Sequence, residues 1–328
     1  MRAFRMILLA ALAAAPLRAH ALDHIKLTVP VFSELDYAPF YLGTDKGYFA
    51  AEGLEVELVG AGGSVATPAL ISGDVQFSGS PSAAISAILK GAPLRIIEVD
   101  RDRPPYQLWA SDPNIRTIED LKGRQVGVVS RGDTHENALR ILLMQHHIDP
   151  ALVAFTGMGF GNGRVAALKS GTLPAASVTV EDIEQLKDAP NVHMVADTGR
   201  EVQMMVGGIA ANARMLGPDR PLALRFLRAI VKGQRYMRAF EDGTVDAMVK
   251  HNPNLSRAAT DAIYRLMVPT NTSDGTLPPP VQKQMLDLYA DIINLPHDKE
   301  QPVGAVFDFS LLPEVERSLA AEGWKPSP

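Results

Sequence analysis

Residues 38–59 read APFYLGTDKGYFAAEGLEVELV, residues 62–64 read GGS and residues 79–82 read GSPS. Each segment lies where a predicted strand (25–31, 55–59 or 75–78) leads through a short loop into a helix. In an open parallel sheet, ligands bind beyond the carboxyl ends of the strands, because helix N-termini there offer unpaired N–H groups and partial positive charge. The stretch therefore predicts an α/β fold with a small-molecule pocket.

The first residues have the pattern of a cleavable signal peptide. Two arginines precede the apolar run 6–15, and residues 19–21 (AHA) supply small side chains at the positions that a signal peptidase reads. The run is about half of the roughly 20 residues that span a bilayer, so residues 1–21 are predicted to be removed and the mature chain to start at Leu22. The chain has no cysteine, which excludes disulfides and a lipid anchor on an N-terminal cysteine. We predict a freely diffusing periplasmic protein.

Chain length and net charge limit the partners and the domain organisation that we expect. Without residues 1–21 the chain has 307 residues, with 29 basic against 37 acidic side chains and a formal net charge of −8. That balance argues against nucleic acid or an anionic lipid surface as partner. A chain of this length exceeds the usual single core, so two lobes are expected. We expect the protein to be a monomer.

Strands and helices alternate along the chain, which is typical of mostly parallel sheets with helices on their faces. The pattern restarts at residues 106–110, where the chain is predicted to enter a second lobe. The predicted division places residues 22–108 and 207–328 in one lobe and residues 109–206 in the other, with two crossovers between them.

Helix starts can be read from capping residues. The helix after the GGS turn has two candidate caps, Ser64 and Thr67, between which the sequence does not decide. Ser80 is predicted to cap the next helix of the first lobe. In the second lobe, residues 133–136 fit a capping box, and a simple Thr134 cap is the alternative.

Several motifs occur together in a familiar order: residues 38–59, ALISGDVQF at 69–77, KGAP at 90–93 and DLKGRQVGV at 120–128. Together they resemble the solute-binding proteins of ABC importers for nitrate, sulfonates, taurine and thiamine-pyrimidine precursors. The resemblance spans residues 26–240. It implies a type II periplasmic binding protein, with two α/β lobes that close on a solute and a membrane permease that reads the closed form.

One segment departs from that pattern. After ALKSG at 167–171, the family continues with a hydrophobic residue and Asp-Ala, whereas this chain has TLPAA at 172–176. The resemblance implies that the missing acid defines the turn into a strand of the second lobe. Its replacement puts the geometry of that turn in question.

Candidate ligand contacts lie on the loops at strand ends. An aromatic ring beside a polar group suits a flat or extended solute, glycine allows close backbone approach, and an arginine offers a fork of donors to an anion. The predicted ligand-binding residues are Ser33, Asp36, Tyr37, Gly62, Gly63, Ser64, Ser80, Ser82, Arg131, Thr134 and Thr179.

No catalytic, phosphate-binding or metal motif occurs in the sequence, so we predict neither an enzyme nor a cofactor or metal. The predicted function is capture of a small organic anion, of sulfonate or carboxylate type, and its delivery to an ABC permease and ATPase complex. Binding of a thiamine-pyrimidine precursor is the alternative within the class. A thiamine-pyrimidine synthase-like enzyme and a solute sensor are the other classes; the former carries a cysteine-rich motif in its family, which this chain lacks.

Overall fold

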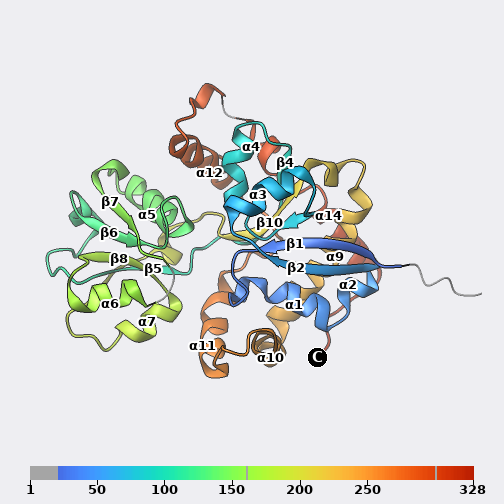
Figure 1. Ribbon diagram of the computed structural model, residues 1–328, viewed down its shortest axis with the longest axis horizontal. Helices are drawn as coiled ribbons and strands as arrows, with labels where there is room; N and C mark the ends of the chain where they lie inside the picture. Colours follow the sequence, from blue (N-terminus) through green and yellow to red (C-terminus); the bar gives the residue numbers. More distant parts are fainter. Residues whose placement is uncertain (1–20, 160–161, 300) are drawn as a thin grey trace, which may run out of the picture.

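The computed structural model describes residues 21–159, 162–299 and 301–328, so the predicted signal peptide falls outside the described residues apart from its last position. Two five-stranded sheets, each flanked by helices, form two lobes joined by a narrow connection (Figure 1). In spatial order, the first sheet consists of β2 (Leu54–Gly60), β1 (Asp23–Val29), β3 (Phe77–Ser78), β10 (Gly207–Asn212) and β4 (Leu94–Arg101). The second consists of β7 (Ala154–Gly157), β6 (Gln125–Val128), β8 (Ala175–Thr179), β5 (Tyr106–Ala110) and β9 (His193–Asp197).

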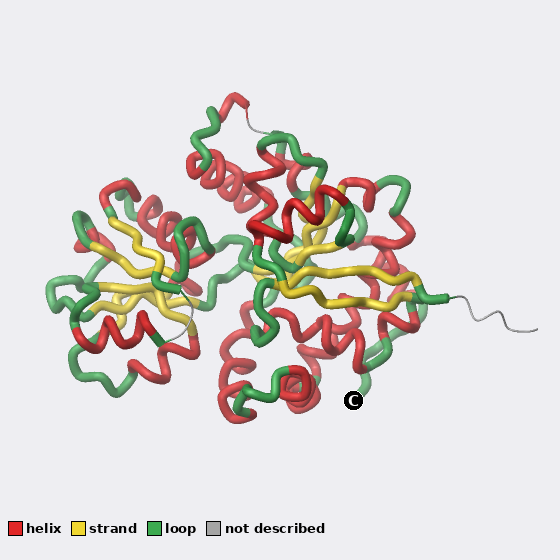
Figure 2. Tube along the Cα trace, in the orientation of Figure 1, coloured by secondary structure: helices red, strands yellow, loops and turns green. Residues whose placement is uncertain are grey.

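The helices divide between the two lobes (Figure 2). The first lobe has α1 (Ala38–Asp45), α2 (Tyr48–Ala51), α3 (Gly63–Ser72), α4 (Pro81–Leu89), α9 (Arg220–Ala239), α10 (Glu241–His251), α11 (Arg257–Met267), α12 (Pro279–Ile292), α13 (Val303–Val306) and α14 (Leu312–Ala321). The second has α5 (Thr134–Gln145), α6 (Gly163–Ser170), α7 (Val180–Leu186) and α8 (Thr198–Glu201). In the described part of the chain, no helix is long and apolar enough to cross a membrane.

Each sheet is mostly parallel and contains one reversed strand. In the first sheet, β1 pairs in parallel with β2 and β3, while β10 is antiparallel to β3 and β4. In the second, β6 pairs in parallel with β7 and β8, while β5 is antiparallel to β8 and β9. The predicted α/β class, with mostly parallel sheets in two lobes, is confirmed.

The chain crosses between the sheets twice. The first crossing is 102–105, since β5 pairs entirely within the second sheet, and the predicted lobe boundary after residue 108 therefore lies too late. The second crossing, 202–206, runs back to β10. Backbone bonds join the two crossings, from Met204 N to Asp102 O at 2.9 Å and from Val206 N to Arg101 O at 3.0 Å. The connection is thus a short paired ribbon rather than two separate strands.

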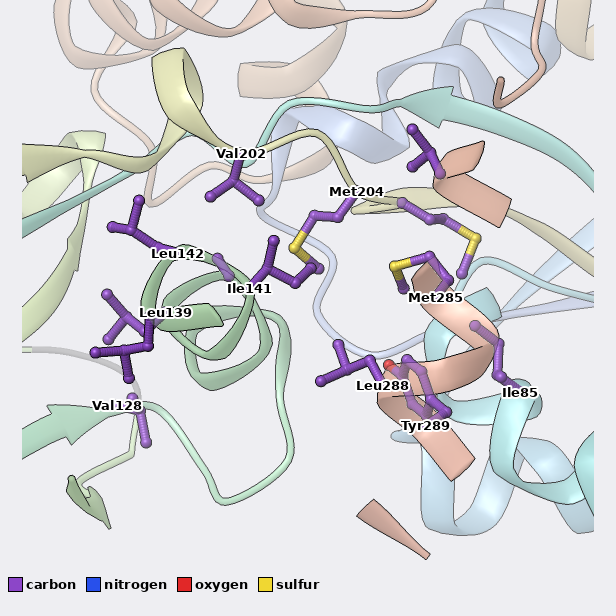
Figure 3. Close-up of a cluster of buried hydrophobic side chains, with 14 of the residues drawn as sticks. Ile85, Val128, Leu139, Ile141, Leu142, Val202, Met204, Met285, Leu288 and Tyr289 are labelled. Carbon is purple, nitrogen blue, oxygen red and sulfur yellow. The ribbon is translucent and has the colours of Figure 1, made fainter. Parts of the chain in front are cut away.

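An apolar cluster continues from one lobe to the other beside this ribbon (Figure 3). Its second-lobe members lie on α5 and β6, its first-lobe members on α4 and α12, and Val202 and Met204 of the ribbon lie between them. Asn137 Nδ2 of α5 also donates to the Tyr289 hydroxyl of α12 at 3.1 Å. Burial of apolar surface therefore ties the lobes together on this side.

Both predicted caps of α3 are wrong, because the helix begins at Gly63 with Gly62 as its N-cap. Gly62 is extended, with φ −70° and ψ 164°, and its carbonyl accepts from Val65 N and Ala66 N. A Cβ on Gly63 would overlap the Cβ of Ala83, so the start of α3 packs backbone-close against α4. That tertiary contact, and not a side-chain cap, sets the first turn.

The structure tests two predictions for the second lobe: the cap of the helix that starts near residue 134 and the turn after residue 171. Asp133 is the N-cap of α5 and accepts from Glu136 N at 2.9 Å, so Thr134 is the first helical residue and not the cap. The reciprocal bond of a capping box is missing, because the Glu136 side chain accepts from Gly132 N at 2.9 Å and not from Asp133 N. The turn without the family's acid is held by hydroxyls, since Thr172 Oγ1 donates to Ala167 O at 3.3 Å. The chain then enters β8 in regular register with β6.

Candidate functional site

A cavity of about 510 Å³ lies between the two lobes, within the range of about 300–1,000 Å³ that is usual for small-molecule sites. Residues just beyond β1, β3, β6 and β8 line it. These are carboxyl ends of mutually parallel strands in each sheet, which is the position that the sequence predicts for a ligand.

The first-lobe wall is aromatic. The 3₁₀ turn Leu35–Tyr37 and the start of α1 present Tyr37 and Phe40, whose rings stack with centroids 5.8 Å apart and planes at 21°. Gly79 makes room for them, since a Cβ there would lie 3.2 Å from Tyr37 Cε1. Burial, followed by the nearby carboxylates of Glu34 and Asp36, raises the pKa of Tyr37 well above its ordinary value. Tyr37 therefore offers the cavity a neutral phenol.

A second stacked pair faces it from the other lobe. The ring centroids of Tyr106, at the start of β5, and His135, in the first turn of α5, are 3.7 Å apart with planes at 16°. The Tyr106 hydroxyl bonds to Thr134 Oγ1 and His135 Nδ1 bonds to Ser177 Oγ, each at 2.8 Å. Burial raises the pKa of Tyr106 and lowers that of His135, so both rings are uncharged at neutral pH.

The start of α4 lines the cavity with hydroxyls. Ser80 occupies the predicted N-cap position, but its side chain makes no capping bond, and its buried Oγ has no partner among the described residues. Ser82 bonds to the hydroxyl of Tyr289, whose pKa burial raises to about 12. Hydroxyls and a helix N-terminus therefore supply neutral polar groups at this edge.

Two carboxyl groups from β4 form the base of the cavity. Glu98 Oε1 accepts from Gln234 Nε2 of α9 at 2.8 Å, and burial raises the pKa of Glu98 well above its ordinary value. Burial and then the nearby Asp36 carboxylate raise the pKa of Asp100 to about 7. Asp36 itself is ion-paired with the buried Arg101. Near neutral pH, the base of the cavity therefore carries carboxyl groups that are partly or wholly protonated.

Among the residues that the structure describes, no lysine or arginine lines this cavity. Arg131, the cationic partner that the sequence offered to an organic anion beside helix N-termini and hydroxyls, is therefore not part of the lining. Uncharged rings, hydroxyls and carboxyl groups take its place.

The structure brings together most of the predicted ligand-binding residues. Those that line the cavity are Asp36, Tyr37, Gly62, Gly63, Ser80, Ser82, Thr134 and Thr179. Ser33 is exposed and outside it, and Ser64 lines a shallower depression that adjoins the cavity and shares lining residues such as Gly63 and Ser130 with it.

Arg131 also lies in the shallower depressions and not in the main cavity. Its Nη1 donates to Phe155 O at 3.1 Å, its Nε pairs with Glu136 at 3.2 Å, and its side chain is 63% exposed. The guanidinium is thus engaged by its own lobe, outside the cavity.

Sequence reasoning missed much of the lining, above all Glu98, Asp100, Tyr106, His135 and Tyr289. A signal for the two acids exists: they stand in LRIIEVDR at 94–101, a strand that is buried over nearly its whole length. Acidic side chains in a buried strand must be paired with a cation, protonated or available to bind a ligand. The aromatic residues have no such local signal.

Comparison with known proteins gives the relationship. Residues 34–242 match the family model described as NMT1/THI5 like. The chain belongs to the NMT1/THI5-like family. The match covers more than half of the chain and confirms the resemblance noted from the sequence motifs.

Three proteins illustrate what this NMT1/THI5-like chain is similar to, and for two of them the likeness is to a solved structure. The riboflavin-binding protein RibY of Chloroflexus aurantiacus is 24% identical over 254 residues, which cover 74% of this chain and 70% of that protein. The periplasmic aliphatic sulphonate binding protein SsuA from Escherichia coli is 16% identical with a TM-score of 0.68, over 90% of this chain and 92% of the other. The periplasmic nitrate-binding protein NrtA from Synechocystis is 13% identical with a TM-score of 0.68, over 91% and 89%. These structures share the fold, and their names differ in solute.

Proposed function

We propose that this chain is the periplasmic solute-binding component of an ABC import system and that it captures a planar ring, uncharged or cationic, between its lobes. Residues 1–21 are removed on export, and the monomeric, unlipidated protein delivers its solute to a permease and ATPase complex. The proposal keeps the predicted class of protein and replaces the predicted organic anion.

The observation that carries the proposal is the make-up of the cavity. Stacked aromatic pairs, Tyr37 with Phe40 and Tyr106 with His135, stand on opposite lobes. An aromatic face attracts another ring or a cation through its quadrupole. Because the described lining has no lysine or arginine, an anion would find only helix N–H groups and hydroxyls there, next to carboxyl groups.

The three named relatives differ in solute: by their names, one binds a ring compound and two bind anions. RibY, by its name, binds riboflavin, which is a planar and uncharged heterocycle. The sulfonate- and nitrate-binding proteins share the fold at lower identity, so their solutes say less about this site. A thiamine-pyrimidine precursor, the alternative solute from the sequence, is also a planar nitrogen heterocycle.

Thermal unfolding with four solutes tests the proposal: riboflavin, 4-aminopyrimidine, ethanesulfonate and nitrate. A solute that binds only the folded state stabilises it by about 2.7 kcal/mol at a hundred times its dissociation constant, so even modest affinity is visible. We expect the rings to raise the melting temperature and the two anions to leave it unchanged. Quenching of riboflavin fluorescence provides a second readout for stacking. Stabilisation by ethanesulfonate or nitrate, with none by either ring, would refute the proposal.

A further inference from the structure

Strand β4 places two acids on the same side of the first sheet. Side chains two residues apart point to the same face of a strand, so Glu98 and Asp100 lie next to each other. Their exposed fractions are 1% and 8%, and both line the cavity. Carboxyl groups are almost never buried this deeply without a partner, because desolvation of the charge is costly.

The neighbouring strand is built to admit them. Gly207 and Gly208 of β10 lie beside β4 at a register shift, and both line the cavity. A Cβ on Gly207 would overlap the Asp100 carboxylate, and one on Gly208 would overlap Glu98 O. Gly208 also has φ 138°, which a residue with a side chain rarely adopts. Gly207 therefore leaves room for the Asp100 carboxylate, and Gly208 lets the backbones of β10 and β4 approach closely.

The hydrogen bonding of the pair is incomplete. Gln234 donates to Glu98 Oε1, but Asp100 Oδ1 is buried and has no hydrogen-bond partner among the described residues. A buried acceptor left unpaired costs about 1–3 kcal/mol, which a donor on a bound solute would recover. Ser80 Oγ, also buried and unpaired, lines the same cavity.

The nearby cations are directed elsewhere. Arg101 bonds to Asp36, to Met267 O at 3.1 Å and to Thr270 Oγ1 at 2.7 Å. Arg238 donates to Thr272 O at 2.8 Å. Neither arginine lines the cavity, so neither stands between the acids and a solute.

We propose that Glu98 and Asp100 receive a nitrogen-bearing, hydrogen-bond-donating edge of the solute and make the site select cations and neutral N–H donors over anions. This inference rests on the proposed ring-binding function and specifies which edge of the ring is read. The stacked aromatic residues hold the faces of the ring, and the acid pair orients it.

Three probes with one ring and different charges test the inference: benzamidinium, benzamide and benzoate. Their dissociation constants are measured by calorimetry at pH 7.5 on the wild-type protein. A hydrogen bond to a charged group contributes about 1.5–3 kcal/mol, so we expect benzamidinium to bind about tenfold or more tightly than benzamide. Benzoate should bind most weakly.

A bound amidinium favours the ionised form of both acids, whose pKa values are raised in the solute-free protein, so Asp100→Asn and Glu98→Gln should each remove most of the preference for benzamidinium while benzamide binding changes little. Two variants are used so that, if one of them fails to fold, the other still tests the inference. Glu55→Gln, an exposed acid on β2, is the matched control for loss of one negative charge and should keep the full preference.

The outcomes separate the two proposals. If benzoate binds as tightly as benzamidinium, or if the preference survives both variants, the acid pair does not read the solute, although ring binding stands. If none of the three rings binds while ethanesulfonate or nitrate does, the proposed function fails and the inference fails with it.

Discussion

The substitution Asp100→Asn should stabilise the solute-free protein more strongly as the pH rises. Asp100 has an ordinary pKa of 3.8, which burial and the Asp36 carboxylate raise to about 7 in the folded protein. The folded state therefore holds a proton that the unfolded state has released between these two pH values. Folding stability falls with pH wherever the folded state binds more protons, so this carboxyl group weakens the fold progressively from about pH 4 to about pH 7.

The size of the effect follows from the shift. Each pKa unit corresponds to about 1.4 kcal/mol, so a shift from 3.8 to about 7 costs the fold about 4 kcal/mol above pH 7. About 3 kcal/mol of that accrues between pH 5 and pH 8, since the unfolded state has already lost its proton at pH 5. The amide of asparagine keeps the shape of the side chain and does not ionise. Its advantage over the wild type should therefore grow by about 3 kcal/mol across this range.

Urea unfolding at pH 5, 6, 7 and 8, at constant ionic strength and without solute, gives the two free energies of unfolding. The Asp100 carboxylate is one of the causes that raise the pKa of Glu98, so the difference between variant and wild type reports both acids, whose contributions change with pH in the same sense. Glu55→Gln, at an exposed position, should show no such trend. A difference that is flat with pH, or larger at pH 5 than at pH 8, would show that Asp100 is ionised in the fold at low pH and that the reasoning is wrong.

Three further substitutions test other parts of the site. Gly207→Ala should destabilise the fold by about 1–3 kcal/mol through overlap with the Asp100 carboxylate, and this cost should shrink in an Asp100→Ala background; an equal cost in both backgrounds, measured by urea unfolding, argues against that contact. Tyr106→Leu should weaken riboflavin or 4-aminopyrimidine binding about tenfold by loss of a stacking face, while Tyr48→Leu, which alters an aromatic residue packed on Trp324 away from the cavity, should leave titration calorimetry unchanged. Arg131→Ala should leave the dissociation constant of every bound solute within about twofold, because the guanidinium pairs with its own lobe; a tenfold loss would return Arg131 to the site.

The sequence predicted the helix starts correctly where residues within one turn determine them. The loop at 79–82 predicted the start of α4 and placed Ser80 and Ser82 at the cavity, because proline at the first helical position acts within one turn, although the Ser80 side chain makes no capping bond. The N-cap Asp133 was likewise visible, although the full capping box does not form. The start of α3 was not, since the contact of Gly63 with Ala83 joins two helices and overrides both candidate caps.

The chemistry of the cavity lining depends on contacts between segments far apart in the chain and on side-chain orientations, which the sequence pattern does not show. The stacking of Tyr106 on His135 needs β5 and α5 side by side, and no spacing along the chain shows that. Whether Arg131 turns into the cleft or toward Glu136 is decided by side-chain packing after the fold has formed. Glu98 and Asp100 differ from these, because two acids at alternate positions, and hence on one face of a strand, could have been singled out from residues 94–101 alone.

The position of the acid pair also joins solute recognition to the geometry of the lobes. Asp100 is followed directly by Arg101, which ends β4, and the first crossing begins at the next residue. Arg101 holds Asp36 of the 3₁₀ turn that presents Tyr37, and it holds the end of α11 through Met267 O. A cationic solute favours the ionised form of Asp100 and therefore changes the charge beside Arg101, the residue that fixes one aromatic wall and the start of the ribbon between the lobes. Of the two acids that read the donor edge of the ring, Asp100 thus lies directly beside Arg101, which connects one aromatic wall of the cavity to the start of the ribbon between the lobes.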